Sequence, residues 1–121
     1  DGFYVVAACI PHAPGARLSE ALVSRFLTQF EVTTDYTLAR KLGVPAKAVT
    51  AAQNLARKQS SGETSWAPQL RELLAFRKAS KVFGEEFAAR NMVAIAPELD
   101  RPVVADVLTR ALGTPVSPLK L

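Results

Sequence analysis

The sequence predicts a mostly α-helical protein, in which a short α/β part of two strands and one helix precedes an all-helical lobe. Three observations lead to this prediction. An apolar run near the start has the composition of a buried strand, the residues after position 34 repeat apolar side chains at helical spacing, and Pro and Gly interrupt that repeat. Because the composition changes near residues 33–35, we expect residues 1–34 to form the α/β part and residues 35–121 the helical lobe.

The first part of the chain contains both expected strands. Residues 3–10 are apolar on both alternations and are followed by a proline, as in a strand buried on both faces of a parallel sheet. Leu18, Leu22 and Phe26 then recur at helical spacing and predict an amphipathic helix of about two turns. Residues 27–32 alternate in polarity, which indicates a second strand near a sheet edge.

Successive helices are expected in the lobe, each marked by a capping residue, a proline or a glycine. Asp35 is suited to cap the first helix, and Gly43 and Gly113 are placed to end the first and the last. Pro45 and Pro68 are suited to open the second and third, since proline fits the first helical turn. The expected helices cover residues 35–42, 45–59, 68–83, 85–95 and 101–112.

The composition limits the possible classes of function. With 49% hydrophobic and 21% charged residues, the chain resembles a soluble globular protein rather than a disordered one. Its longest apolar stretch, residues 5–10, is too short to span a bilayer. The formal net charge of +4 favours anionic partners such as nucleotides, nucleic acid or an acidic protein face. Cys9 is the single cysteine, which fits a reducing cytoplasm, and we expect it to be a small buried hydrophobe.

The most informative stretch is the helix expected at residues 18–26. It reads Leu-Ser-Glu-Ala-Leu-Val-Ser-Arg-Phe and follows Val-Val-Ala-Ala-Cys-Ile-Pro at residues 5–11. Together these segments resemble the sensor-1 strand and arginine-finger helix of MoxR-type AAA+ ATPases, in which the pattern is V-I-A-T-x-N-P … L-x-E-A-L-L-x-R-F. The resemblance covers nearly the whole chain and implies that residues 35–121 are the helical lid of such an ATPase.

This resemblance implies a cytoplasmic, chaperone-like remodelling protein that hydrolyses ATP. It implies ATP and Mg²⁺ as cofactors, and neighbouring copies in a hexameric ring and a protein client as partners, whereas membrane or nucleic-acid binding is not expected. Arg25 would be the catalytic arginine finger, acting on ATP bound by a neighbouring copy. A guanidinium suits this role because it keeps its charge and offers a fork of donors to the γ-phosphate.

Two positions depart from the family pattern. Ile10 stands where the family has the sensor-1 asparagine, and an isoleucine is unable to orient the attacking water. Gln69 stands where the lid helix carries the sensor-2 arginine, and Arg71 follows two residues later. Because two residues turn a helix by about 200°, either Arg71 reaches the nucleotide after a register shift or the lid contributes packing only. No metal ligands are expected, since His12 is the only histidine and has no second ligand at a useful spacing.

The phosphate-binding elements of the family are absent from the sequence. No Gly-x-x-x-x-Gly-Lys-Ser/Thr motif occurs, and no apolar strand ends in paired acidic residues that could hold Mg²⁺. In the family both elements precede the sensor-1 strand. We therefore expect this chain to be the C-terminal part of an ATPase, unable to hydrolyse ATP alone and prone to self-association or dependent on a partner.

Two other functions are compatible with the sequence. A short helix, a Gly-Val turn and a second helix that carries Lys47, Arg57 and Lys58 also resemble a helix-turn-helix DNA-binding unit. Against this, the second helix begins with small residues that are poorly suited to reading base edges. A helical protein-interaction module without catalysis is the third alternative.

Overall fold

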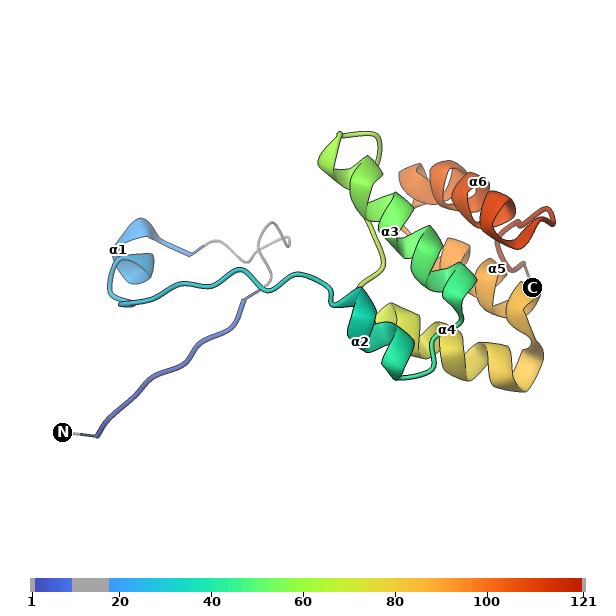
Figure 1. The fold of residues 1–121 in the computed structure, drawn as a ribbon. Helices are drawn as coiled ribbons and strands as arrows, with labels where there is room; N and C mark the ends of the chain where they lie inside the picture. The colour runs from blue at the N-terminus through green and yellow to red at the C-terminus, as the bar shows by residue number, and fades with distance from the viewer. Residues whose placement is uncertain (1, 10–17, 121) are drawn as a thin grey trace. The chain divides into compact units, whose positions relative to one another are not determined.

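The computed structural model describes residues 2–9 and 18–120 of the chain (Figure 1). The described elements are α1 (Glu20–Val23), α2 (Tyr36–Lys41), α3 (Ala46–Ser60), α4 (Leu70–Phe83), α5 (Glu85–Ile95), the 3-10 helix η1 (Glu98–Asp100) and α6 (Arg101–Leu112). The prediction of a mostly α-helical protein is confirmed. The chain divides into two compact units, residues 1–32 and 33–121. None of the described helices is long and apolar enough to cross a membrane.

The two predicted strands are not found among the described residues. Residues 3–9 and 27–32 have no regular secondary structure, and the prediction of an α/β part with two strands is wrong there. A strand needs a neighbour to share its ladder of hydrogen bonds, and no described segment pairs with either stretch. Their apolar side chains are exposed instead, with Phe3 at 86% and Leu27 at 102%. Cys9, expected to be buried, is exposed for the same reason.

The helix predicted over residues 18–26 is present only as the short α1. The Ser19 hydroxyl accepts a hydrogen bond from the Leu22 amide (3.2 Å) and caps its start. At the other end, the Ser24 hydroxyl donates to the Ala21 carbonyl (3.0 Å). No residue of α1 is buried. Because isolated helices of this length are marginal in water, a helix without a packing partner does not extend to two turns.

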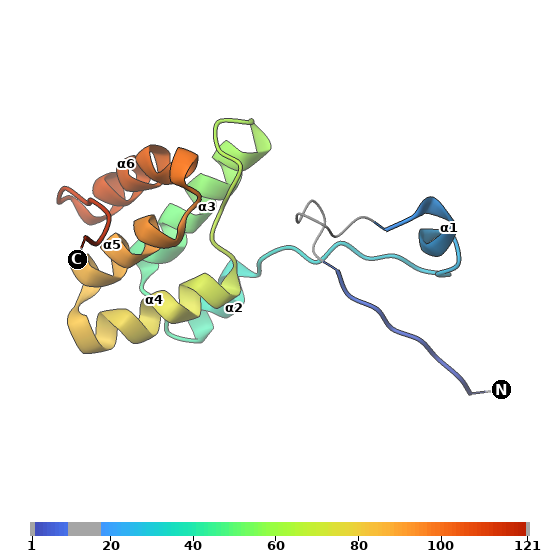
Figure 2. The ribbon, with the colours of Figure 1, turned by 180° about the vertical axis from the view of Figure 1, so that it is seen from behind.

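Residues 33–121 form a helical module around one apolar core. Every buried apolar side chain of the described chain lies between Ala39 and Val116. Helix α3 contacts α2, α4 and α6, and α5 contacts both α4 and α6 (Figures 1 and 2). Ala48, Ala51 and Ala52 on the inner face of α3 are fully buried. Such small side chains let neighbouring helices approach closely, so the core is built from short contacts rather than from large aromatic residues.

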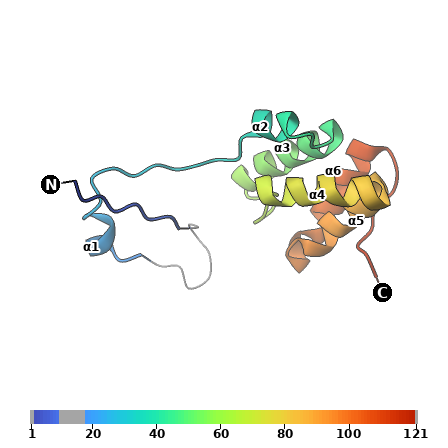
Figure 3. The ribbon, with the colours of Figure 1, turned by 90° about the horizontal axis from the view of Figure 1, so that it is seen from below.

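The connection from α2 to α3 shows why the predicted boundaries hold. The Asp35 carboxylate accepts a hydrogen bond from the Leu38 amide (2.9 Å) at the start of α2. Gly43 ends the helix with a φ of +84°, a conformation that favours glycine. Arg77 of α4 donates a hydrogen bond to the Leu42 carbonyl, so the end of α2 is held by α4 while α2 lies beside α3 (Figure 3). The five helices of the module agree with their predicted bounds to within two residues.

A buried carboxylate joins the loop after α3 to the start of α6. Asp100 is buried, and its side chain accepts hydrogen bonds from the Ser65 hydroxyl (2.6 Å) and the Ser65 amide (3.1 Å). The Ser65 hydroxyl lowers the pKa of the Asp100 carboxyl, while burial acts in the opposite direction. Beside it, Arg101 donates to the carbonyls of Ala94 (3.0 Å) and Ala96 (3.2 Å) and satisfies the end of α5.

Replacement of Leu55 by Ala is expected to lower the free energy of unfolding by about 3 kcal/mol, because it opens a cavity in the core. Leu55 is fully buried, whereas Leu99 is 93% exposed, so Leu99→Ala is the matched control and should change stability by less than about 0.5 kcal/mol. Urea denaturation of the three proteins measures this difference. Equal losses in the two variants would contradict the assignment of the core.

Acidification is expected to weaken the two hydrogen bonds that the Asp100 carboxylate accepts from Ser65. Because the pKa of this carboxyl is lower in the folded state, its contribution to stability is present above the unfolded-state pKa of about 3.9 and is lost as the pH falls through the folded-state value. Asp100→Asn removes this titration. The stability difference between wild type and Asp100→Asn, from urea unfolding at pH 6 down to pH 2.5, should therefore shrink below about pH 4. A difference that stays constant over this range would show that Asp100 is not held as a carboxylate.

Candidate functional site

Arg25, the predicted arginine finger, lies in the turn that follows α1. Its side chain is exposed, and no described residue forms an ion pair with it. The Arg25 amide donates to the Leu22 carbonyl (3.2 Å), and the next residue, Phe26, donates to the Val23 carbonyl (3.2 Å). Leu22 is 44% exposed and Phe26 is half-buried, so the apolar anchoring of this turn is partial. The turn therefore holds the Arg25 backbone through local hydrogen bonds and leaves its side chain exposed.

Gln69, one of the two predicted nucleotide contacts, is the N-cap of α4. Its side chain accepts a hydrogen bond from the Glu72 amide, and the Glu72 carboxylate accepts one from the Gln69 amide (2.8 Å). This reciprocal pair is a capping box, which satisfies two backbone donors at the start of the helix. The Gln69 side-chain oxygen also accepts a hydrogen bond from the Thr34 hydroxyl (2.5 Å). The Gln69 side chain is therefore engaged in holding the helix start.

Arg71, the other predicted contact, lies in the first turn of α4 with 87% of its side chain exposed. Its only ion pair among the described residues is with the Glu72 carboxylate, at 3.1 Å. The two partners differ in burial, because the Glu72 side chain is only 13% exposed and its carboxylate also accepts a hydrogen bond from the Gln69 amide. Gln69 and Arg71 thus share one helix end and both contact Glu72, but only Arg71 extends into solvent. Arg25 belongs to the other unit, and Ile10 and His12 lie outside the described residues.

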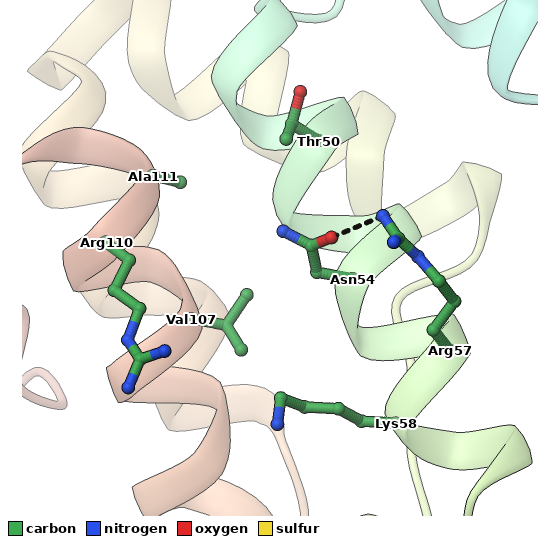
Figure 4. Close-up of a pocket in the computed structure, with 7 residues that line it drawn as sticks. All are labelled: Thr50, Asn54, Arg57, Lys58, Val107, Arg110 and Ala111. Carbon is green, nitrogen blue, oxygen red and sulfur yellow. Dashed lines mark hydrogen bonds between the residues drawn. The ribbon is translucent and has the colours of Figure 1, made fainter.

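A second candidate site, which the sequence did not predict, lies between α3 and α6 (Figure 4). It is an open pocket of about 400 Å³, here called the α3/α6 groove. Its lining residues are Thr50, Asn54, Arg57 and Lys58 from α3 and Val107, Arg110 and Ala111 from α6. Spacing along α3 could have shown that its four polar residues share a face. The contribution of α6 depends on how two distant helices pack, and no sequence signal reports it.

The charges around the α3/α6 groove are arranged in pairs. Lys58 contacts the Glu63 carboxylate at 2.6 Å, and its hydrogen bond and charge hold the pKa of that carboxyl below its usual range. Arg110 contacts Asp106 at 3.1 Å in an exposed pair one helical turn apart. Neither carboxylate lines the groove. The groove itself therefore carries three cationic side chains and no acidic one.

Comparison of the chain with protein-family models, with curated proteins and with solved structures found no match. Within residues 2–9 and 18–120, no group of three or more His, Cys, Asp and Glu side chains is arranged to hold a metal ion.

Replacement of Gln69 by Ala is expected to lower the free energy of unfolding by about 1 kcal/mol, because the Glu72 amide loses its capping acceptor. Gln69→Ser should recover most of this loss, since a serine hydroxyl accepts the same bond. Arg71→Gln, at an exposed side chain, should change stability by less than about 0.5 kcal/mol. Thermal and urea unfolding measure all three, and a Gln69→Ala variant as stable as wild type would exclude the capping role.

Proposed function

We propose that this chain supplies the arginine finger and the helical lid of a MoxR-type AAA+ ATPase that remodels a protein client. In this proposal ATP and Mg²⁺ are the cofactors, copies assemble in a ring, and the phosphate-binding loop comes from residues outside this sequence. The observation that carries the proposal is the pattern at residues 18–26, in which a serine-capped helical turn is followed directly by the exposed Arg25. A finger needs this combination, because its guanidinium must extend from a held backbone to a phosphate on another copy.

The exposed apolar residues of the first unit support this proposal. Phe3, Val6, Phe30 and Val32 are each more than four-fifths exposed, although their composition is that of buried strands. Strand-like segments of this kind are stabilised when neighbouring strands complete their hydrogen bonds and cover their side chains. An AAA+ α/β core would supply those neighbours, and Arg25 would then be held between two segments of an ordered sheet domain.

The helical module supports the assignment of a lid, and it favours Arg71 over Gln69 as the residue that contacts phosphate. Gln69 is occupied by its capping interactions, whereas Arg71 is exposed at the N-terminal end of α4. The partial positive charge of a helix N-terminus adds to that of the guanidinium and favours an anion there. Arg71 is thus the residue proposed to sense nucleotide, and Gln69 is the residue proposed to fix the helix that carries it.

The helix-turn-helix alternative has less support. Helix α2, a short turn and α3 do follow one another, but Ala48, Val49, Ala51 and Ala52 are fully buried in the core. The first turns of α3 therefore leave few polar side chains, such as Thr50, to reach base edges. DNA reading by α3 is accordingly not proposed.

Replacement of Arg25 by Ala in the complete ATPase is expected to reduce ATP turnover by about 10³-fold or more while ATP binding is retained. Arg25→Lys should have ATP turnover almost as low as that of Arg25→Ala, because an ammonium group lacks the fork of donors of a guanidinium. Arg40→Ala, which removes an exposed arginine of α2 that the proposal does not use, is the matched control and should turn over at the wild-type rate. Steady-state hydrolysis and equilibrium binding of a fluorescent ATP analogue measure the two quantities.

A subunit-mixing experiment tests whether Arg25 acts on a neighbouring copy. Arg25→Ala subunits keep an intact phosphate-binding loop, so adding subunits that have Arg25 but are unable to bind ATP should restore part of the turnover. Two results would contradict the assignment of Arg25 as the arginine finger. One is ATP turnover by Arg25→Ala alone at the wild-type rate, and the other is a mixture of subunits that stays as inactive as Arg25→Ala alone. Tight binding of the chain to duplex DNA with a steep dependence on salt would instead favour the helix-turn-helix alternative.

A further inference from the structure

The α3/α6 groove presents hydrogen-bond donors and no carboxylate. Lys58 and Arg110 contribute cationic groups from two different helices, and Thr50 adds a hydroxyl. Lysine and arginine side chains have donors but no acceptors. Such a lining is complementary to a ligand that is rich in acceptors and carries negative charge.

The orientation of Asn54 strengthens this donor character. Its side-chain oxygen accepts a hydrogen bond from the Arg57 guanidinium at 2.6 Å. Because a guanidinium only donates, this bond fixes the amide with its oxygen toward Arg57 and its nitrogen on the other side. Figure 4 shows the Asn54 nitrogen turned toward α6, where Lys58 also extends its ammonium group. Arg57 therefore acts as a positioning residue that aims a neutral donor into the groove.

The acidic partners of the groove lie outside its lining and are exchangeable. The Glu63 and Asp106 side chains are both more than half exposed, at 56% and 53%. Because both carboxylates are open to water, these ion pairs are screened, and an anion that enters the groove competes with Glu63 and Asp106 for Lys58 and Arg110. Lys58 and Arg110 are therefore held in place by ion pairs that an anionic ligand of higher affinity can replace.

We propose that the α3/α6 groove binds a small phosphate-bearing molecule. A volume of about 400 Å³ lies in the range of small-molecule pockets. Val107 and Ala111 provide an apolar floor that suits the carbon body of a phosphate ester, with Lys58 and Arg110 on the phosphate oxygens. A duplex backbone would need cations along an extended surface, whereas these are gathered around one concave pocket between two helices. The site includes neither Arg25 nor Arg71, so it is separate from the proposed ATPase function.

Titration of the full-length chain with pyrophosphate tests this site without any ATPase assay. Amide shifts in ¹⁵N–¹H NMR spectra, recorded at constant ionic strength, are expected for residues 50–58 and 107–111. Lys58→Gln and Arg110→Gln should each weaken binding by at least about fivefold, the loss expected for one charge-assisted hydrogen bond. Lys47→Gln removes the same charge from the exposed start of α3, outside the groove, and should change affinity less than about twofold.

A second pair of variants tests the competition by Glu63. Glu63→Gln frees Lys58 and should strengthen pyrophosphate binding, whereas Glu86→Gln, the same charge change on an exposed residue of α5, should not. Lys47 and Arg110 are exposed and Lys58 is partly covered, so none of these substitutions removes a buried side chain. A circular dichroism spectrum checks that each variant is folded.

Three results would overturn the proposal: no amide shifts in the groove, an equal loss in Lys47→Gln and Lys58→Gln, or tighter binding of an acidic peptide or a duplex DNA than of pyrophosphate. The second would show diffuse attraction of anions, and the third would identify a protein or nucleic-acid surface instead.

Discussion

The close packing of the inner face of α3 is the constraint on which the helical module depends. Ala48, Ala51 and Ala52 are fully buried where α3 meets its neighbours, and Leu55 fills the core one turn later. A larger side chain at the three alanines would separate the helices, since a close-packed protein core does not absorb added volume. Helical periodicity then places the polar residues of α3 on the remaining face, beside α6. The core and the α3/α6 groove are two consequences of one pattern along α3.

The two units of the chain differ in whether their apolar residues find partners. The module buries one apolar core within residues 39–116, although Val82, Phe83 and Leu99 stay exposed. Its helix ends are held by Arg77, Arg101 and Asp100. In the first unit, residues 3–9 and the apolar residues after α1 (Leu27, Phe30 and Val32) are exposed. The reason is that a helix forms its backbone hydrogen bonds within one segment, whereas a strand needs a neighbouring strand to form them. This difference links the structure to the proposal that the first unit is completed by an AAA+ core.

Local signals explain which parts of the structure were predictable. Asp35, Gly43 and Gly113 act within one turn of the chain, and the helices that they bound were predicted to within two residues. The prediction of two strands was wrong because the hydrogen bonds of a strand ladder join segments that are distant in the chain. The α3/α6 groove was not predicted because it joins residues about 50 positions apart. At α4, the Gln-x-x-Glu spacing from Gln69 is itself a capping signal, and it gives a structural role to a residue that the family pattern places in the sensor-2 position. The role of Arg25 rests on the sequence pattern and stays a prediction.

Hydrogen exchange tests the central claim, that the first unit becomes ordered only as part of an ATPase core. Exchange would be measured by mass spectrometry for this chain alone and for the complete ATPase with ATP bound. We expect α3 to α6 to be protected in both, and residues 3–9 and 18–32 to exchange rapidly in the chain alone and to be protected in the complete, nucleotide-bound ATPase. If these residues exchange equally fast in both samples, the apolar segments are not core strands and the account of Arg25 as an arginine finger is contradicted.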